Sequence, residues 1–581
     1  MAPRYLIVFD TDRSRMGDVV AGIHPEAGLR RVLETETLSV LASNDASPLV
    51  MSNRQGAVIG HVFSGIAPTR RVSGFSERDS EAIGRSRGQI LVDQFWGGYV
   101  AIIPVAGGNA VDILRDPSGA MPCYYTSING GHTRVIASDL ETLVRSGLFR
   151  PTIDWEVLPG HLVAYDLRTP RTCLKNLSEV MAGNRLTLGP NGNASATCWS
   201  PKMFAECPEK GTLEDISRKL EEVASGTIAA WHSAFEHPLL GVSGGLDSSI
   251  VAAVLAASGR PASFFTMATG DAAGDERQYA RTLGQGLGVD IFERFYELDQ
   301  VDVRLPTSRH LPRPLLCAFG QSEQKQKLAI AAERGADAIF LGVGGDNVFC
   351  NLSSASPFLD RLLTEGPGSG AWRTARDTCR LTGCSLFELG IGAIRRAVRG
   401  RQYAWTREID FLTPGAAATV LPPHPWLSDS AGLLPGKLAH IAMLTRIQGT
   451  IDGFSRFTSP PMVLPLLSQP LVEFCLSVPA WRWIEGGRNR SPARRAFASV
   501  LPKAILDRRS KGTPNSFAYD VIDRNRSVAR DQLLNGILAA NGLLDVEKTA
   551  NTLAENVPLK GFDHMRMSIL LEAEAWCRQW S

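Results

Sequence analysis

The sequence SGGLDSS at residues 243–249 follows the apolar run PLLGV at 238–242 and precedes the alanine-rich run IVAAVLAA at 250–257. This order is typical of a buried strand, a glycine-rich turn and a helix. Glycines let the backbone approach a polyphosphate closely, and the N-terminus of the following helix favours an anion. A glycine-rich turn that binds no ligand is the alternative. We expect the loop to bind the pyrophosphate part of ATP through Ser243, Gly244, Gly245, Asp247, Ser248 and Ser249.

Asp247 places a carboxylate beside phosphate oxygens, which is repulsive unless a cation lies between them. Mg²⁺ suits this position, because it prefers one or two carboxylates together with phosphate oxygens and water. A second loop, GVGGDN at residues 342–347, also follows a short apolar run and carries Asp346 next to Gly344 and Gly345. Open α/β sheets bind ligands at the carboxyl ends of their strands. The sequence therefore predicts that Asp247 and Asp346 share one Mg²⁺ ion.

Further apolar runs alternate with alanine-rich segments of helical length, and these runs occupy residues 261–267, 291–296 and 337–343. Such alternation predicts βαβ units and a parallel sheet. Residues at the ends of the first two strands are candidates for an adenosine pocket, although core packing explains them equally well. They are Leu240, Val242 and Met267.

The segments before and after this sheet differ in character. Residues 1–205 contain short strand-like runs at 5–9, 99–105, 111–116 and 133–139, which predict a β-rich domain. Glycine and proline clusters at 189–192 and 201–211 indicate a linker, after which apolar residues at helical spacing begin at Leu213. From about Leu352 the chain is largely helix-like. We expect an α/β and α+β multidomain protein with domains at 1–205 and 206–581.

Composition excludes several classes of protein. The chain has 581 residues, of which 44% are hydrophobic and 21% charged, as in globular proteins with two or three domains. A formal net charge of +2 gives no general electrostatic case for binding nucleic acid. No run of eighteen apolar residues and no secretion signal is evident, so we expect no membrane association and a cytoplasmic location.

These loops and several later segments carry a resemblance that covers nearly the whole chain. The first loop resembles the SGGxDSS pyrophosphate loop of N-type ATP pyrophosphatases, and the second is similar to the SGEGxDE loop of asparagine synthetase B. The resemblance implies that ATP is cleaved to AMP and pyrophosphate, with Asp247 and Asp346 in the site. It also implies that Lys511 stabilises negative charge on the activated carboxyl group. Further matches follow in chain order at Asp275, Glu276, residues 465–474, Arg490, Arg494 and residues 508–512.

Residues 1–205 resemble the class II glutaminase domain of asparagine synthetase B, through segments at 97–99, 114–125 and 137–139. This implies an Ntn-type β-sandwich. A working glutaminase of this class uses an N-terminal cysteine as nucleophile, with its own α-amine as base. Ala2 occupies position 2 here, so we expect no ammonia to be made from glutamine.

The second loop also departs from asparagine synthetase. Val343 and Asn347 stand where that enzyme has two glutamates. A valine cannot orient or deprotonate an attacking amine, so we expect a nucleophile other than ammonia. Loss of glutaminase chemistry with retention of adenylation is shared by β-lactam synthetases and lasso-peptide cyclases, both relatives of asparagine synthetase. β-Lactam synthetases pair a tyrosine and a glutamate as base, and no such pair is evident from spacing here.

Four segments look like lasso-peptide cyclases, at residues 342–349, 465–473, 486–497 and 508–512. That resemblance implies ATP-dependent closure of a macrolactam in a precursor peptide. It also implies two partners, a leader-peptide-binding protein and a leader peptidase. Other classes stay open: a small-molecule amide synthetase of β-lactam or ammonia-dependent asparagine type, an RNA- or nucleotide-modifying ATP pyrophosphatase, and a non-catalytic peptide-binding scaffold.

Replacing Lys511 with alanine is expected to leave ATP binding intact and to lower the rate about a hundredfold or more. One charge-stabilising donor in a closed site contributes roughly 3 to 4 kcal/mol to the transition state. Titration with ATP and a turnover assay measure the two quantities separately. Turnover of the variant at the wild-type rate would remove Lys511 from the mechanism.

Overall fold

The computed structural model describes residues 1–52, 55–65, 69–190, 192–271, 274–315, 318–398, 403–428, 431–509 and 512–581. Lys511, expected above to be catalytic, lies outside the described residues. Within the described parts of the chain, no helix combines the length and the apolar character needed to cross a bilayer.

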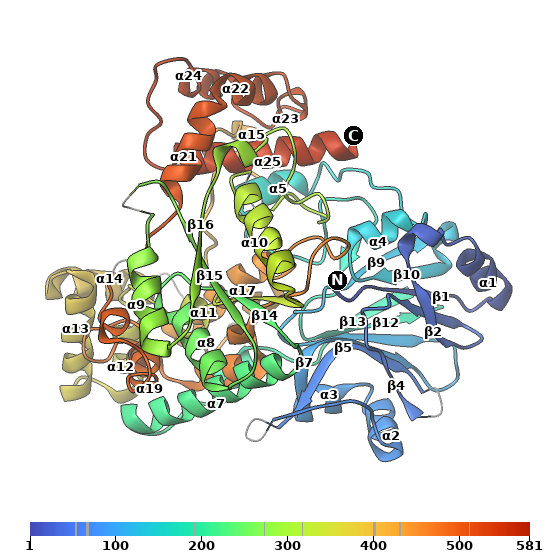
Figure 1. Ribbon diagram of the computed structural model, residues 1–581, viewed down its shortest axis with the longest axis horizontal. Coiled ribbons are helices and arrows are strands. Elements are labelled where there is room, and N and C mark those ends of the chain that lie inside the picture. Colours follow the sequence, from blue (N-terminus) through green and yellow to red (C-terminus); the bar gives the residue numbers. More distant parts are fainter. Residues whose placement is uncertain are drawn as a thin grey trace.

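Two antiparallel sheets lie within the first 200 residues and face each other at the right of Figure 1. The first sheet has the order β11-β9-β10-β1-β3-β2, and its strands are β1 (Tyr5–Phe9), β2 (Arg30–Glu34), β3 (Leu38–Ala42), β9 (Tyr124–Ile128), β10 (Thr133–Ala137) and β11 (Ser178–Glu179). The second has the order β13-β12-β8-β7-β5-β4, with β6 beside β5. Its strands are β4 (Leu49–Val50), β5 (Ala57–Ser64), β6 (Arg70–Arg71), β7 (Phe95–Pro104), β8 (Val111–Arg115), β12 (Asn184–Gly189) and β13 (Gly192–Thr197).

Alternation of side chains along β1 explains why this part is a sandwich. Tyr5 and Ile7 join Val100 and Ile102 of β7 in one buried cluster between the sheets. Leu6, on the opposite face of the same strand, joins a second cluster with helices from the C-terminal part. Each such buried side chain contributes about 1.5 to 3 kcal/mol. The predicted β-rich sandwich is therefore confirmed.

The glycine cluster at residues 189–192, predicted to belong to a linker, lies instead in a hairpin. Gly189 of β12 pairs with Gly192 of β13 in the second sheet. Every residue of β13 is exposed, so the strand lacks the apolar alternation that identifies strands in a sequence. Turn residues alone do not separate a hairpin from a linker.

A five-stranded parallel sheet with the order β16-β15-β14-β17-β18 forms the centre of the second half. Its strands are β14 (Pro238–Gly241), β15 (Ser263–Ala268), β16 (Ile291–Phe295), β17 (Ala338–Leu341) and β18 (Met462–Val463). The chain adds β15 and β16 on one side of β14 and then returns to add β17 on the other. The strand order thus reverses between the neighbouring strands β14 and β17. Open α/β sheets bind ligands at the carboxyl ends of strands at such a point.

Helices surround both parts, and the predicted helical C-terminal part is confirmed. α7 starts at a capping box in which Thr212 and Asp215 satisfy each other's backbone N–H groups. Helices α21 to α25 form a layer at the top of Figure 1. The first half contributes α1 (Arg13–Ala21), α2 (Glu77–Arg85), α3 (Gln89–Gln94), α4 (Leu140–Arg145) and α5 (Leu158–Val163). The second half contributes α6 (Lys202–Ala205), α7 (Leu213–Ser233), α8 (Leu246–Ala257), α9 (Arg277–Leu287), α10 (Gly320–Arg334), α11 (Gly345–Val348), α12 (Ser356–Glu365), α13 (Ser369–Thr382), α14 (Leu386–Val398), α15 (Pro414–Ala417), α16 (Pro425–Ser428), α17 (Pro435–Ile447), α18 (Gln469–Ser477), α19 (Ser491–Ala496), α20 (Lys503–Leu506), α21 (Asn515–Arg524), α22 (Arg526–Leu534), α23 (Ile537–Ala540), α24 (Val546–Thr552) and α25 (Asp563–Trp580).

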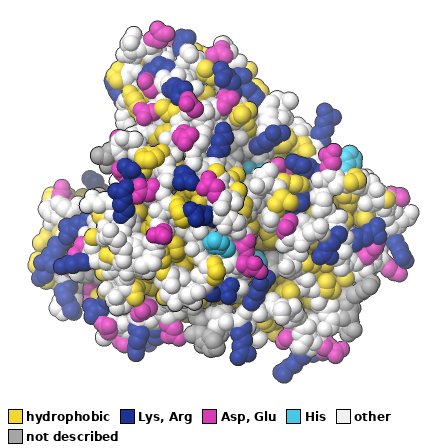
Figure 2. Space-filling model, viewed as in Figure 1, with side chains coloured by type: hydrophobic (Ala, Val, Ile, Leu, Met, Phe, Trp, Pro, Cys, Tyr) yellow, Lys and Arg dark blue, Asp and Glu magenta, His cyan; other side chains and the backbone are white. Residues whose placement is uncertain are grey.

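Charged side chains of both signs are interspersed over the face drawn in Figure 2. Lysine and arginine side chains gather at the left edge of that view, where Figure 1 places α13 and α14. A mixed surface of this kind suits a globular protein with a small net charge.

A buried carboxylate, Glu179, joins the two halves of the molecule. The Glu179 carboxylate forms ion pairs with Arg115 at 2.6 Å, Arg168 at 2.7 Å and Arg313 at 2.9 Å. Arg115 and Arg168 belong to the first half, and Arg313 belongs to the second. Burial raises the pKa of Glu179, but Arg168, Arg313 and Arg115 together outweigh it and lower the pKa well below its usual value. The charged form is therefore the one that stabilises the fold.

Glu179→Gln is expected to lower the free energy of unfolding by about 3 to 5 kcal/mol, because three buried guanidinium groups lose their counter-charge. Since the folded pKa lies below the unfolded value of 4.5, the stabilisation is present above that pH and is lost as the pH falls. Urea midpoints at pH 7 and pH 4 measure both effects, and the gap between the two proteins should narrow at pH 4. Glu156→Gln, which removes an exposed partner of Arg171, is the matched control and should cost less than about 1 kcal/mol. Equal midpoints for Glu179→Gln and the wild-type protein at pH 7 would contradict the assignment.

Candidate active site

The two predicted loops lie side by side because the strands that precede them are neighbours. β14 and β17 pair in parallel, with Leu240 opposite Phe340 and Gly241 opposite Leu341. Each strand ends in a short glycine-rich loop that leads directly into a helix, α8 after the first and α11 after the second. Parallel pairing therefore places Asp247 next to the loop that carries Asp346.

Two glycines let the loops interlock. A Cβ atom on Gly342 would lie 2.5 Å from the backbone nitrogen of Ser248, and one on Gly345 would lie 2.3 Å from Cγ of Asp247. Both distances are shorter than any ordinary carbon contact, so a side chain at either position would push the loops apart. The glycines of the second loop thus determine how closely the first loop can approach it.

Hydroxyl groups line the first loop. The Oγ atoms of Ser243 and Ser248 lie 3.2 Å apart, and the Ser248 hydroxyl donates to the carbonyl of Gly245. Among the described residues, no side chain caps the N-terminus of α8, which begins at Leu246 and has twelve residues. The first N–H groups of α8 are therefore available to an anion.

Asp247 and Asp346 meet at a single cation, the guanidinium group of Arg490. Nη1 of Arg490 lies 2.9 Å from Oδ2 of Asp247 and 2.6 Å from Oδ1 of Asp346. Asn351 donates to the same Oδ1 of Asp346 at 3.0 Å. Arg490 itself has a positive φ of 53°, a backbone conformation that is unfavourable for a long side chain. The fold thus holds a positive charge between the two carboxylates.

These loops open into a cavity of about 380 Å³, within the range of ligand sites. The structure places seven of the predicted residues on its wall: Val242, Ser243, Gly245, Asp247, Ser248, Met267 and Asp346. Five others lie behind the wall: Leu240, Gly244, Ser249, Gly344 and Gly345. Leu240 and Ser249 are fully buried. Apolar side chains form one side of the cavity and include Phe265, Tyr296, Leu341 and Ile505.

The residues present fit a magnesium ion. Among the described residues, no group of three or more His, Cys, Asp or Glu side chains could hold a metal without other ligands. Mg²⁺ needs no such group, because it takes one or two carboxylates and completes its shell with phosphate oxygens and water. One oxygen of Asp247 and one of Asp346 both contact the same nitrogen of Arg490, so the two carboxylates converge where such an ion would bind.

Glu276 contacts residues on both sides of the predicted Lys511. Its carboxylate accepts from Arg508 and, at 2.8 Å, from the backbone N–H of Gly512. Arg508 also donates to the carbonyl of Ser243 in the first loop at 3.1 Å. Glu276 therefore contacts both Arg508 and Gly512, and Arg508 contacts the phosphate loop, while Lys511 itself lies outside the described residues.

A comparison with protein-family models identifies both halves of the chain. The model for asparagine synthase matches residues 239–409 and 439–578, which together are more than half of the chain. The chain belongs to the asparagine synthase family. A model for a glutamine amidotransferase domain matches residues 76–199. As a member of the asparagine synthase family, the protein is an ATP-dependent carbon–nitrogen ligase, and the family uses ATP, generally with Mg²⁺.

Solved structures add only weak likenesses. One is the allosteric regulatory enzyme of purine biosynthesis, with 10% identity and a TM-score of 0.22 over 50% of this chain and 80% of that one. Another is the glutamine phosphoribosylpyrophosphate amidotransferase of B. subtilis in complex with ADP and GMP. Its identity is 12% and its TM-score 0.22, over 58% of this chain and 90% of that one. No curated protein matches this member of the asparagine synthase family.

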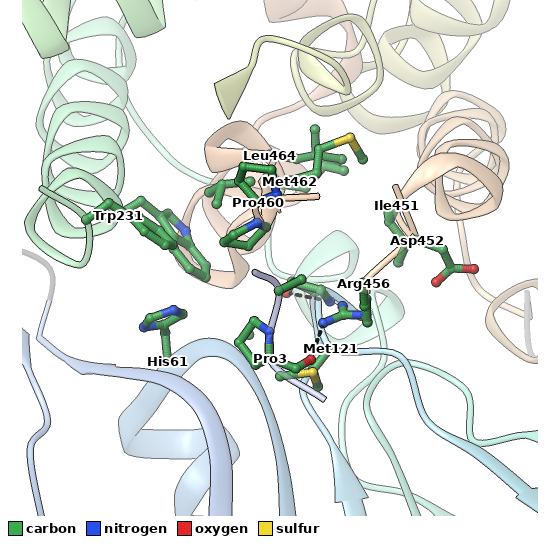
Figure 3. A pocket seen from close by; sticks show the side chains of 18 of the residues that line it. Pro3, His61, Met121, Trp231, Ile451, Asp452, Arg456, Pro460, Met462 and Leu464 are labelled. Carbon is green, nitrogen blue, oxygen red and sulfur yellow. Dashed lines mark hydrogen bonds between the residues drawn. The ribbon is translucent and has the colours of Figure 1, made fainter. Parts of the chain in front are cut away.

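A second cavity lies where the amidotransferase-like half meets the ligase half of this asparagine synthase family member. It measures about 60 Å³, and Figure 3 shows His61 and Trp231 on one side of it and Met462 and Leu464 at its top. Ala2 lies on its wall, almost fully buried, and its backbone N–H donates to the carbonyl of Ser459. The side chain at this position is a methyl group, which cannot act as a nucleophile.

Glu276→Ala is expected to lower kcat by about ten- to a hundredfold while changing ATP affinity less. The loss follows because misplacing a catalytic segment by about 1 Å can cost a hundredfold in rate. Glu276→Gln, which keeps an acceptor for Gly512, should fall between the two. ATP titrations with the full-length enzyme separate kcat from KM. The matched control is Glu293→Ala, which removes a partner of Arg281 that does not line the cavity. A kcat equal to that of the control would show that Glu276 does not position this segment.

Proposed function

We propose that this ligase closes a macrolactam in a precursor peptide. In the first step a carboxylate oxygen of an Asp or Glu side chain attacks the α-phosphorus of ATP, and pyrophosphate leaves. In the second step the peptide's own N-terminal amine attacks the acyl carbon, AMP leaves, and the amine loses a proton to solvent. The product is a lasso-type isopeptide bond within one peptide.

The carboxylates on the described cavity wall support this proposal, because each one is already paired with a basic side chain. Asp247 and Asp346 pair with Arg490, and Glu276 pairs with Arg508. The remaining acid among the described wall residues, Glu323, lies 2.5 Å from Nζ of Lys327. Each of these carboxylates already has a cationic partner, so none of them is free to orient an incoming amine. This arrangement favours a nucleophile that needs little help to lose its proton.

An N-terminal α-amine meets that requirement. Its usual pKa of about 7.7 to 8.0 leaves roughly 10 to 20% as free base at pH 7, whereas a lysine with a pKa of about 10.4 is almost entirely protonated. Val343 supports the same conclusion, because it lines the cavity near Asp346 and has no group that could activate ammonia. Ala2, which lacks a thiol, argues against ammonia from glutamine.

Each residue of the site has a proposed role. The first loop is proposed to bind pyrophosphate through Ser243, Gly245 and Ser248, which line the cavity. Gly244 and Ser249, also predicted to bind it, lie behind the wall and support the loop. Asp247 and Asp346 would hold Mg²⁺, which when bound neutralises charge on the β and γ phosphates. Lys511 is proposed to stabilise charge on the activated carboxyl group. The adenosine is proposed to lie near Leu240, Val242 and Met267, of which Val242 and Met267 line the cavity.

Partners follow from the resemblance to lasso-peptide cyclases. The substrate would be a precursor peptide, and a leader-binding protein and a leader peptidase would deliver it without its leader. Holding the amine near the acyl-adenylate in one folded peptide replaces a bimolecular encounter, which can contribute about 7 to 11 kcal/mol. Binding the peptide in a folded form is thus the main task left to the enzyme.

Synthetic core peptides test the proposal. With ATP and Mg²⁺, a peptide with N-terminal glycine and an acid several positions on should support exchange of pyrophosphate into ATP and lose one water by mass spectrometry. The same peptide with an acetylated N-terminus should support exchange but form no ring, because its nitrogen is no longer nucleophilic.

Two results would contradict this function. One is accumulation of asparagine when the enzyme receives ATP, aspartate and ammonia. The other is loss of water from the acetylated peptide, since its ring could not use the terminal amine. A peptide in which the acid is replaced by its amide is the second control and should support neither exchange nor ring closure.

A further inference from the structure

We propose that a chamber lined by arginines receives the pyrophosphate that adenylation releases. The chamber lies next to the cavity of about 380 Å³ that the two glycine-rich loops open into, the ATP cavity. The inference rests on the proposed function, in which ATP is cleaved between its α and β phosphates. The chamber measures about 220 Å³, and five arginines line it: Arg380, Arg488, Arg494, Arg508 and Arg509. Among its described lining residues the one carboxylate is Asp507, which pairs with Arg488 at 2.6 Å.

The chamber and the ATP cavity share a wall. Asn489, Arg494, Arg508 and Arg509 line both. Arg508 donates to the carbonyl of Ser243, so the shared wall touches the phosphate loop. The chamber therefore lies next to residues that contact the phosphate loop.

Backbone contacts fix the positions from which the two outer arginines, Arg380 and Arg488, leave the chain. Arg380 lies on α13 and packs against Gly487, where an added Cβ atom would come within 2.9 Å of its own Cβ. Gly487 has a φ of 72° and directly precedes Arg488. The N–H of Gly486 donates to Asp377 of α13 at 3.1 Å, which ties the loop to the helix. Both outer arginines thus have fixed backbone positions at the chamber wall, and their side chains are exposed.

Arg494 shows that positive charge in the chamber exceeds the negative charge nearby. Its hydrogen bonds within the described residues all go to uncharged oxygens, on Asn489, Leu506 and Arg508. Burial, together with the charges of Arg490 and Arg488, lowers the pKa of Arg494 to about 10. A buried cation among other cations is stabilised by an anion.

The lining selects pyrophosphate over other anions. Guanidinium groups match phosphate oxygens with two parallel hydrogen bonds. Leu381 and Leu506 are the apolar residues of the described wall, so a nucleobase finds no flat apolar surface there. An acidic peptide would also suit arginines, but the position beside the phosphate loop favours the product that forms in that loop.

Such a chamber would affect the direction of the reaction. Pyrophosphate that remains in the phosphate loop can attack the acyl-adenylate and reform ATP. Pyrophosphate held by Arg380 and Arg488 lies off that path, so the peptide amine has longer to attack the same acyl carbon. The chamber would thus favour ring closure over the return to ATP without contacting the peptide.

Calorimetric titration of the full-length protein tests the chamber without any peptide. The ATP cavity is first filled with α,β-methylene-ATP and Mg²⁺, since this analogue cannot release pyrophosphate. Sodium pyrophosphate is then titrated in. We expect binding to the loaded wild-type protein, and binding about tenfold or more weaker in the double variant Arg380→Gln, Arg488→Gln.

Arg395→Gln is the matched control, because Arg395 is an exposed arginine of α14 that does not line the chamber. Pyrophosphate and analogue affinities of this control should equal those of the wild-type protein. The double variant should also bind the analogue normally, which shows that it folds. The proposal is overturned if loaded wild-type protein binds no pyrophosphate, if the double variant binds it as tightly, or if a glutamate tetrapeptide binds there and pyrophosphate does not displace it. Because no substrate peptide is used, failure of macrolactam formation would leave this result unchanged.

Discussion

Parallel pairing of β14 with β17 is the constraint on which the site depends. It brings Asp247 and Asp346, nearly a hundred residues apart in sequence, to the same edge of the sheet. Two carboxylates so close together repel each other, and Arg490 offsets that repulsion by binding both. A divalent ion would compete with Arg490 for the same oxygens. On the proposed function, one cation would replace the other at these oxygens when Mg²⁺ and ATP enter.

Buried charge also joins the two halves of the molecule. Glu179 binds Arg115, Arg168 and Arg313, and Arg168 also reaches Asp452 of the second half at 2.7 Å. Burying these groups is costly unless every charge is satisfied, so the network specifies one arrangement of the halves. An amidotransferase-like half whose position 2 is alanine still packs against the ligase half. Its retained role in this protein is consistent with structural support for the second half.

Local patterns allowed much of the fold to be predicted, and long-range contacts account for what was missed. The strand at residues 5–9 was predicted to the residue as β1, and the glycine-rich loop after β14 was located from its own seven residues. The hairpin at Gly189 was mistaken for a linker because its outer strand has no apolar face. The resemblance marked Glu276 and Arg490 as matches, but the partners that they bind in the site could not be read from spacing. Their partners lie 232 and 243 residues away, and only the folded chain brings them together.

The distribution of charge around the site is what separates its two cavities. Around the ATP cavity, acids and bases occur in pairs: Asp247 and Asp346 with Arg490, and Glu276 with Arg508. Beyond Arg494 the balance changes, and arginines outnumber carboxylates. A bound nucleotide with its metal ion carries a partly neutralised charge and suits the balanced cavity, whereas a free polyphosphate carries its full charge and suits the basic chamber. The electric field of the protein therefore draws the product away from the loop in which it forms.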